Sequence, residues 1–184
     1  MNVAPDFRGE LLAMIPSLRA FSMSLCGKAD RADDLVQETL IKAWTNHARF
    51  EPGTNMRAWL FTILRNQYYS ELRKRRREVE DADGSLSGNL AVQPGQHGHM
   101  DMQNFLSALQ QIPEDQREAL VLVGASGFTY AEAAEIIGVA TGTAKSRVSR
   151  ARARLAEILK LGDEADYGSE TATEAVLANL AVGC

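Results

Sequence analysis

The chain has 184 residues, which is enough for one medium domain or two small ones. Its hydrophobic fraction of 45% permits buried cores, and because no apolar run approaches the ~18 residues of a membrane helix, we expect no membrane span. The net charge of −4 argues at first sight against nucleic-acid binding. However, basic residues gather in local runs, and local charge decides binding to a phosphate backbone.

Two features of the sequence bear on the compartment. Asp6, Arg8 and Glu10 interrupt any apolar run at the start, so we expect no signal peptide. The two cysteines, Cys26 and Cys184, form no spaced disulfide framework and fit a reducing environment. We therefore expect a soluble, cytoplasmic protein.

The first part of the chain has helical periodicity and almost no strand signal. The apolar positions of a first expected helix are Met14, Leu18, Phe21 and Leu25. Those of a second helix, which is led by Asp30, are Val36, Leu40, Ala43, Trp44 and His47. The polar face of this second helix carries Asp34, Gln37, Glu38 and Lys42. Periodicity alone leaves open whether this face is plain solvent-exposed surface or a docking surface.

A Pro-Gly loop, Phe50–Asn55, precedes a long third helix that is expected from about Met56 to about Arg77. Its buried side carries Leu60, Ile63 and Leu64, and its opposite side carries Arg65, Asn66, Tyr69 and Arg73. Such a polar and aromatic face can stack on unpaired bases and read their edges, and the loop can fold over an extruded base. The alternative is that the aromatics, above all Trp59, belong to the core and that the basic run is a solvated helix end.

Composition changes after Glu80. Residues 81–99 contain four glycines and Pro94, which predicts a flexible linker. Helical signals resume at about Asp101, break at Ile112-Pro113 and resume over residues 114–125. The tail from Gly162 is rich in alanine and acidic residues, which fits either disorder or one amphipathic helix.

Residues 127–154 have the pattern of a helix-turn-helix. Thr129 and Glu132 predict a capping box at the start of a short helix, and Gly138 predicts its end with a positive φ. Thr141 is the expected N-cap of the second helix. A short helix, a glycine turn and a basic helix are typical of a DNA-binding motif whose second helix reads the DNA.

The second helix of this motif has two different faces. Its apolar stripe consists of Ala144, Val148, Ala151, Leu155 and Ile158. The opposite face is small at its centre and cationic at its margins, with Gly142, Thr143, Lys145, Ser146, Ser149, Arg150, Arg152 and Ala153. This shape suits a backbone that approaches base edges while its flanks meet phosphates. The alternative is an αα-hairpin with a solvated basic face and no nucleic-acid role.

Together these segments resemble an RNA polymerase sigma factor of the extracytoplasmic-function class. The resemblance rests on three matching stretches, Asp33–Trp44, Phe50 with Ala58–Asn66, and Thr129–Arg154. The run around Phe50, Leu64–Tyr69 and Arg73–Asp81 is most similar to the EcfG-type subgroup, which directs general stress responses.

The resemblance implies an all-α fold of two small helical domains. The σ2 domain would span residues 10–80, a flexible linker residues 81–100, the helix-turn-helix σ4 domain residues 101–161, and an acidic tail residues 162–184. It implies core RNA polymerase (the β′ coiled coil and the β flap) as a partner, with Asp34, Gln37 and Glu38 docking on the β′ coiled coil. It implies contact with the promoter −10 element through Phe50, Asn55, Arg65, Asn66, Tyr69, Ser70 and Arg73. It implies contact with the −35 element through Gly142, Thr143, Lys145, Ser146, Ser149 and Arg150.

The resemblance also implies an anti-sigma factor as inhibitor, with a linker that lets the domains change between a compact and an extended form. We expect a monomer before assembly, and no cofactor, metal site or catalytic activity, since His47, His97 and His99 do not cluster with other ligands. Two alternatives stay open. One is a helix-turn-helix regulator that binds duplex DNA alone, and the other is a sigma-like decoy that sequesters an anti-sigma factor.

Overall fold

The computed structural model describes residues 7–81 and 97–159, and in these ranges its secondary structure is entirely helical, as expected. We call these two ranges the N-terminal half and the C-terminal half. The N-terminal half contains α1 (Phe7–Ala13), α2 (Ile15–Cys26), α3 (Ala29–Thr45), a 3-10 turn (His47–Arg49) and α4 (Met56–Asp81). The C-terminal half contains α5 (His97–Gln110), α6 (Glu114–Leu120), a π-helical turn (Val121–Ala125), α7 (Tyr130–Ile137) and α8 (Thr141–Ile158).

Several helix boundaries differ from the sequence expectation. The seven-residue α1 was not expected, and α2 starts immediately after it with Pro16 in its first turn, the one part of a helix that tolerates a missing N–H. His47 lies in the 3-10 turn rather than in α3. α4 continues to Asp81, beyond Arg77, and α5 begins before residue 101. The rest of the expected linker and the acidic tail lie outside the described residues.

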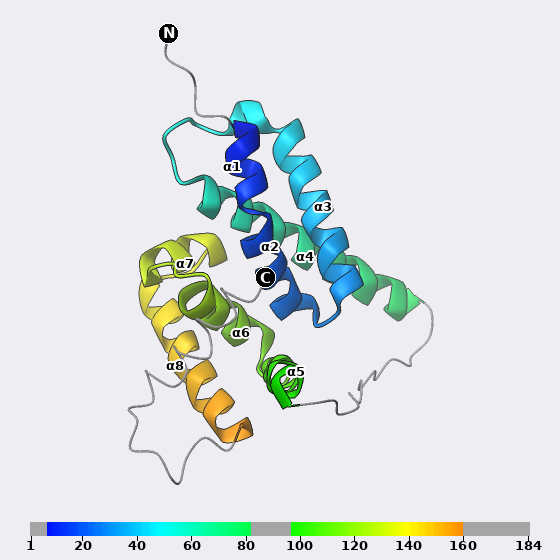
Figure 1. The fold of residues 1–184 in the computed structure, drawn as a ribbon, viewed down its shortest axis with the longest axis vertical. Helices are drawn as coiled ribbons and strands as arrows, with labels where there is room; N and C mark the ends of the chain where they lie inside the picture. Colours follow the sequence, from blue (N-terminus) through cyan, green and yellow to red (C-terminus); the bar gives the residue numbers. More distant parts are fainter. Residues whose placement is uncertain (1–6, 82–96, 160–184) are drawn as a thin grey trace.

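In the N-terminal half, α2, α3 and α4 pack around a common apolar core (Figure 1). Phe21 of α2 stacks on Phe61 of α4 with ring centroids 5.0 Å apart, and both rings are fully buried. α2 ends at Gly27, whose φ of 67° places it in the left-handed region that glycine adopts without steric cost.

In the C-terminal half, α7 and α8 form the expected helix-turn-helix, and α8 packs along α6 (Figure 1). The predicted capping box is present, because the Thr129 side chain accepts from the Glu132 backbone and Glu132 accepts from the Thr129 N–H. Gly138 ends α7 with φ 78°, as predicted. The predicted N-cap of α8 is wrong by one residue. The extended residue before the helix is Ala140, and Thr141 is already helical.

The two halves contact each other through α4 and α7 and through α2, α5 and α6. Phe128, just before α7, packs edge-to-face on Phe61 with ring centroids 4.9 Å apart, and the Arg57 guanidinium lies 4.5 Å from the Phe128 ring centroid. At the other end of the contact, the side chain of Gln110 donates to the Ser24 carbonyl at 2.8 Å. The buried residues of the two halves therefore form one continuous core. We call this the closed arrangement.

Within the residues that the structure describes, no helix is long and apolar enough to cross a membrane.

Candidate nucleic-acid interface

The outer face of α8 is exposed along its length. Ala144, Val148, Ala151 and Leu155 are buried against the rest of the C-terminal half, as predicted, while Ile158 is half-buried. The opposite residues Gly142, Thr143, Lys145, Ser149 and Arg150 are exposed, and Ser146 is half-buried. The helix therefore presents a small centre and cationic margins to solvent in the closed arrangement.

Two contacts fix the position of α8 on its neighbours. Arg147 pairs with Asp115 of α6 at 3.1 Å, so this cation supports the helix rather than its outer face. Lys145 lies 5.8 Å from the ring centroid of Tyr130 on α7, at the edge of cation–π range. The Ser146 hydroxyl donates to the Thr143 carbonyl of its own helix at 2.9 Å, and so it is engaged locally.

A second polar surface lies between α3 and α4 in the N-terminal half. It is a groove of about 420 Å³, which we call the α3–α4 groove. Its lining residues are Lys42, Asn46, Arg49, Trp59, Ile63, Asn66, Gln67, Ser70 and Arg73. The groove thus combines three cations, an indole wall and several amide groups, the chemistry that holds a nucleic-acid backbone and stacks an unpaired base.

The indole wall is held by an aromatic cluster. The Trp59 ring lies 5.2 Å from that of Phe50, and Phe7 of α1 contacts both of them. Phe50 and Trp59 are each half-buried, so Phe50 supports the wall of the groove and Trp59 is only partly a core residue.

Of the residues implied for the −10 element, the structure places Asn66, Ser70 and Arg73 in the α3–α4 groove. Sequence reasoning did not assign Lys42, Asn46 or Arg49 to this surface. Lys42 and Asn46 are one helical turn apart, which is a weak signal by itself. Their role becomes visible only when α3 and α4 lie side by side.

Two other α4 residues of the expected −10 set, Arg65 and Tyr69, face the C-terminal half. Arg65 forms an ion pair with Glu118 of α6, with Nε 2.7 Å from Oε1, and the Tyr69 hydroxyl donates to Glu118 Oε2 at 3.2 Å. The Asn55 amide, in the loop before α4, donates to Glu132 Oε1 of α7 at 3.1 Å. The structure therefore divides the expected −10 set between an open groove and the contact between the halves.

This contact between the halves is largely shielded from water, and burial changes the pKa values of its ionisable groups. Burial raises the pKa of the Glu118 carboxyl, although the Arg65 charge pulls it in the opposite direction. Burial and the charge of Glu118 also raise the pKa of the Tyr69 hydroxyl, which therefore remains a proton donor at neutral pH. The hydroxyl of Tyr68, the preceding residue, donates to Glu114 at 2.5 Å, and its oxygen lies 3.1 Å from the Leu25 carbonyl oxygen.

The polar face of α3 is open to solvent. Asp34, Gln37 and Glu38 are all exposed, and Ile41, one turn further along the same face, is 65% exposed. An exposed apolar side chain beside polar and acidic ones suits a protein-docking surface. Gln67 of α4 joins this face to the α3–α4 groove, because it accepts a hydrogen bond from Lys42 and donates to Glu38.

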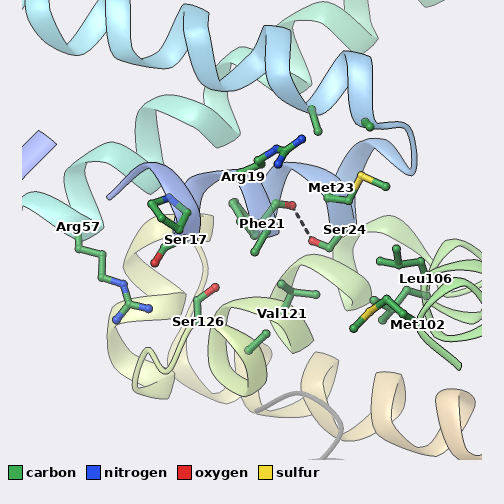
Figure 2. Close-up of a pocket in the computed structure, with 16 residues that line it drawn as sticks. Ser17, Arg19, Phe21, Met23, Ser24, Arg57, Met102, Leu106, Val121 and Ser126 are labelled. Carbon is green, nitrogen blue, oxygen red and sulfur yellow. Dashed lines mark hydrogen bonds between the residues drawn. The ribbon is translucent and has the colours of Figure 1, made fainter. Parts of the chain in front are cut away.

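A third surface is an apolar groove that both halves build, with a volume of about 340 Å³. Figure 2 shows it between α2, which carries Ser17 to Ser24, and the π-helical turn with Val121, which Ser126 directly follows. Met102 and Leu106 of α5 close one end and Arg57 closes the other. No group of three or more His, Cys, Asp or Glu side chains able to hold a metal ion occurs among the described residues.

Comparison with family models and with known proteins identifies the relatives of the chain. Residues 12–78 match the family model for Sigma-70 region 2, and residues 102–155 match that for Sigma-70, region 4. The chain is 55% identical over 177 residues to the ECF RNA polymerase sigma factor EcfG of Rhodopseudomonas palustris, which covers 96% of this chain and 98% of that protein. It is 32% identical to the ECF sigma factor SigM of Bacillus subtilis over 77% of this chain and 88% of that one.

Solved structures agree with the sequence comparison. The sigma factor RpoE of Bartonella quintana, in complex with the anti-sigma factor NepR, superposes with a TM-score of 0.78 at 56% identity, covering 86% of this chain and 99% of that one. CnrH in complex with the cytosolic domain of CnrY superposes with a TM-score of 0.59 at 25% identity. From its two family matches, its relatives and its fold, the chain belongs to the extracytoplasmic-function RNA polymerase sigma factors and is a promoter-specificity subunit.

Proposed function

We propose that this sigma factor places core RNA polymerase on a promoter through two separate DNA contacts, one in each half of the chain. The observation that carries the proposal is the outer face of α8, which is small at its centre, cationic at its margins and exposed on a helix-turn-helix. The N-terminal residues of such a helix enter the major groove. We assign the −35 element to Gly142, Thr143, Lys145, Ser146, Ser149 and Arg150.

The −10 element is assigned to the N-terminal half. Asn66 and Ser70 offer hydrogen bonds to an unstacked base in the α3–α4 groove, and Trp59 offers a surface for stacking. Lys42, Arg49 and Arg73 would hold the backbone of the separated strand. We keep Phe50, Asn55, Arg65 and Tyr69 in the −10 set. In the closed arrangement the last three are bonded to glutamates of the C-terminal half.

Docking on core polymerase is assigned to α3. Asp34, Gln37 and Glu38 supply polar contacts, and Ile41 supplies an exposed apolar anchor between them and the end of the helix. The division into a σ2 domain at residues 10–80, a linker, a σ4 domain at residues 101–161 and an acidic tail belongs to the same proposal. The two family matches, at residues 12–78 and 102–155, support it.

The regulatory partner we propose is an anti-sigma factor, and the genes served are those of a stress response. The support is the relative RpoE, which is solved with NepR, and the 55% identity to EcfG. A partner that occupies the apolar groove would contact both halves at once. We also propose that the chain acts in the cytoplasm, where core polymerase works, and that it has no catalysis of its own.

Run-off transcription with purified core polymerase across candidate stress promoters tests this function. Asn66→Ala should abolish strand opening while polymerase still binds the promoter, and Lys145→Ala should weaken binding only at promoters that depend on a −35 element. A gel shift with duplex promoter, with and without core polymerase, separates the alternatives. Tight duplex binding by the free chain, without transcription, would instead support a helix-turn-helix regulator.

A further inference from the structure

Two glutamates of the C-terminal half bond to polar side chains of the N-terminal half that we assign to the −10 element. Glu118 contacts both Arg65 and Tyr69, and Glu132 accepts a hydrogen bond from Asn55. A carboxylate offers the guanidinium and hydroxyl donors the same kind of acceptor as a phosphate oxygen or a base edge. In the closed arrangement these three side chains therefore have protein partners where promoter DNA would need them.

Glu118 is the central acid of this contact. Its side chain is 1% exposed and that of Arg65 is 21% exposed, so the pair is largely shielded from water. A second cation, Arg147, lies close enough to stabilise the carboxylate from within the C-terminal half. A buried carboxylate whose cations come from both halves joins the halves for as long as the charges stay paired.

The closed arrangement does not cover every DNA-binding surface. The outer face of α8 stays exposed, and Asn66, Ser70 and Arg73 stay in the open groove. The contact thus engages the side chains of Asn55, Arg65 and Tyr69 and leaves the duplex-reading helix free. A closed chain would meet duplex DNA but would lack part of the surface that holds the separated −10 strand.

We propose that Glu118 is an intramolecular latch, which keeps the free sigma factor closed by occupying Arg65 and Tyr69, and that promoter opening requires its release. The inference rests on the proposed function, because it assigns Arg65 and Tyr69 to the −10 element. It needs no inhibitor protein, since both partners of the latch belong to this chain. Only the open fraction can hold the separated −10 strand, and so the apparent affinity for the opened promoter is reduced by that fraction.

Glu118→Gln in the full chain tests the latch. Glutamine keeps the size of the side chain but leaves Arg65 without its counter-charge in a dry contact, so the closed arrangement should lose population. Small-angle X-ray scattering should show a radius of gyration larger by several ångström than that of the wild type. In run-off transcription with limiting sigma factor, the concentration for half-maximal product should fall by on the order of tenfold.

The matched control replaces both partners. Arg65→Met combined with Glu118→Met removes both charges and keeps apolar bulk, so scattering should show the compact wild-type radius again. Should Glu118→Gln lose its helical circular dichroism, Arg65→Gln breaks the same pair from the other half and is read by scattering alone.

An unchanged radius of gyration in the folded single variants would overturn the latch. A larger radius without a fall in the half-maximal concentration would overturn its inhibitory role. The scattering result does not depend on transcription. If the wild type yields no transcript, the proposed function fails, while scattering still shows whether the Glu118–Arg65 pair holds the chain closed.

Discussion

Phe128→Ala should destabilise the half of the molecule to which Phe128 does not belong. The residue is 3% exposed, and truncating a buried phenylalanine costs about 3–5 kcal/mol in total. Part of this energy comes from contacts of Phe128 with the N-terminal half. The edge-to-face pair with Phe61 contributes about 0.5–1.5 kcal/mol. The Arg57 guanidinium over the ring contributes about 0.5–1 kcal/mol. The N-terminal half should therefore lose about 1–2.5 kcal/mol of its free energy of unfolding.

The chain carries its own probe for this measurement. Both tryptophans, Trp44 and Trp59, lie in the N-terminal half, so their fluorescence reports its unfolding separately. With a urea m value of roughly 2 kcal/mol/M, their midpoint should fall by roughly 0.5–1.2 M in Phe128→Ala. A midpoint that stays at the wild-type value would refute the contact between the halves in solution.

A double-mutant cycle isolates the ring pair within that effect. Combining Phe128→Ala with Phe61→Leu should give a coupling energy of about 0.5–1.5 kcal/mol, because the two rings touch directly. Strictly additive losses would mean that the rings do not meet.

Three further predictions follow from single residues. Gly27→Ala should lower the free energy of unfolding by at least about 1–2 kcal/mol, since its φ is 67° and a Cβ would lie 2.9 Å from Cδ of Gln110. Thermal denaturation measures this loss, and wild-type stability of the variant would contradict the tight approach. Hydrogen bonds from Thr129, at the start of α7, lower the pKa of Glu132 from 4.5. The carboxylate therefore contributes to the free energy of unfolding above pH 4.5, and this contribution is lost as the pH falls through the lowered pKa. Glu132→Gln cannot titrate, and its melting temperature should fall less than that of the wild type between pH 5 and pH 3; parallel curves would exclude this role. Ser149→Glu should reduce transcription from −35-dependent promoters by on the order of tenfold, while Ala153→Glu, one turn further on, should have a much smaller effect; equal losses would place the DNA elsewhere.

Local pattern was enough to predict the helix-turn-helix. The Thr129 capping box, the Gly138 turn and the buried stripe from Ala144 to Leu155 each depend on residues within a few positions of one another. The N-cap of α8 was misplaced by one residue because Thr141 has the chemistry of a cap, whereas the backbone turns at Ala140. Short-range signals therefore located the motif correctly but not each boundary.

Features that depend on packing between distant segments could not be predicted in the same way. Glu118 is an ordinary acidic residue of a helix in the sequence, and only the approach of α4 turns it into a buried partner of Arg65. The cations of the α3–α4 groove come from two helices and one turn, and periodicity within one helix does not reveal such a surface. Arg65 and Asn66 are neighbours in the chain, yet they end on different sides of α4.

The side chain of Gln67 has a consequence for the genetics of this protein. It is bonded at once to Glu38 and Lys42 on α3 and to Glu71 on α4, one residue away from Asn66. An alanine scan that removes Glu38 to weaken polymerase docking also releases Gln67 beside the groove, so docking and strand-opening defects would be recorded under one substitution. Ile41 has no part in these bonds. Substituting it is the cleaner way to separate assembly from melting in any collection of mutants.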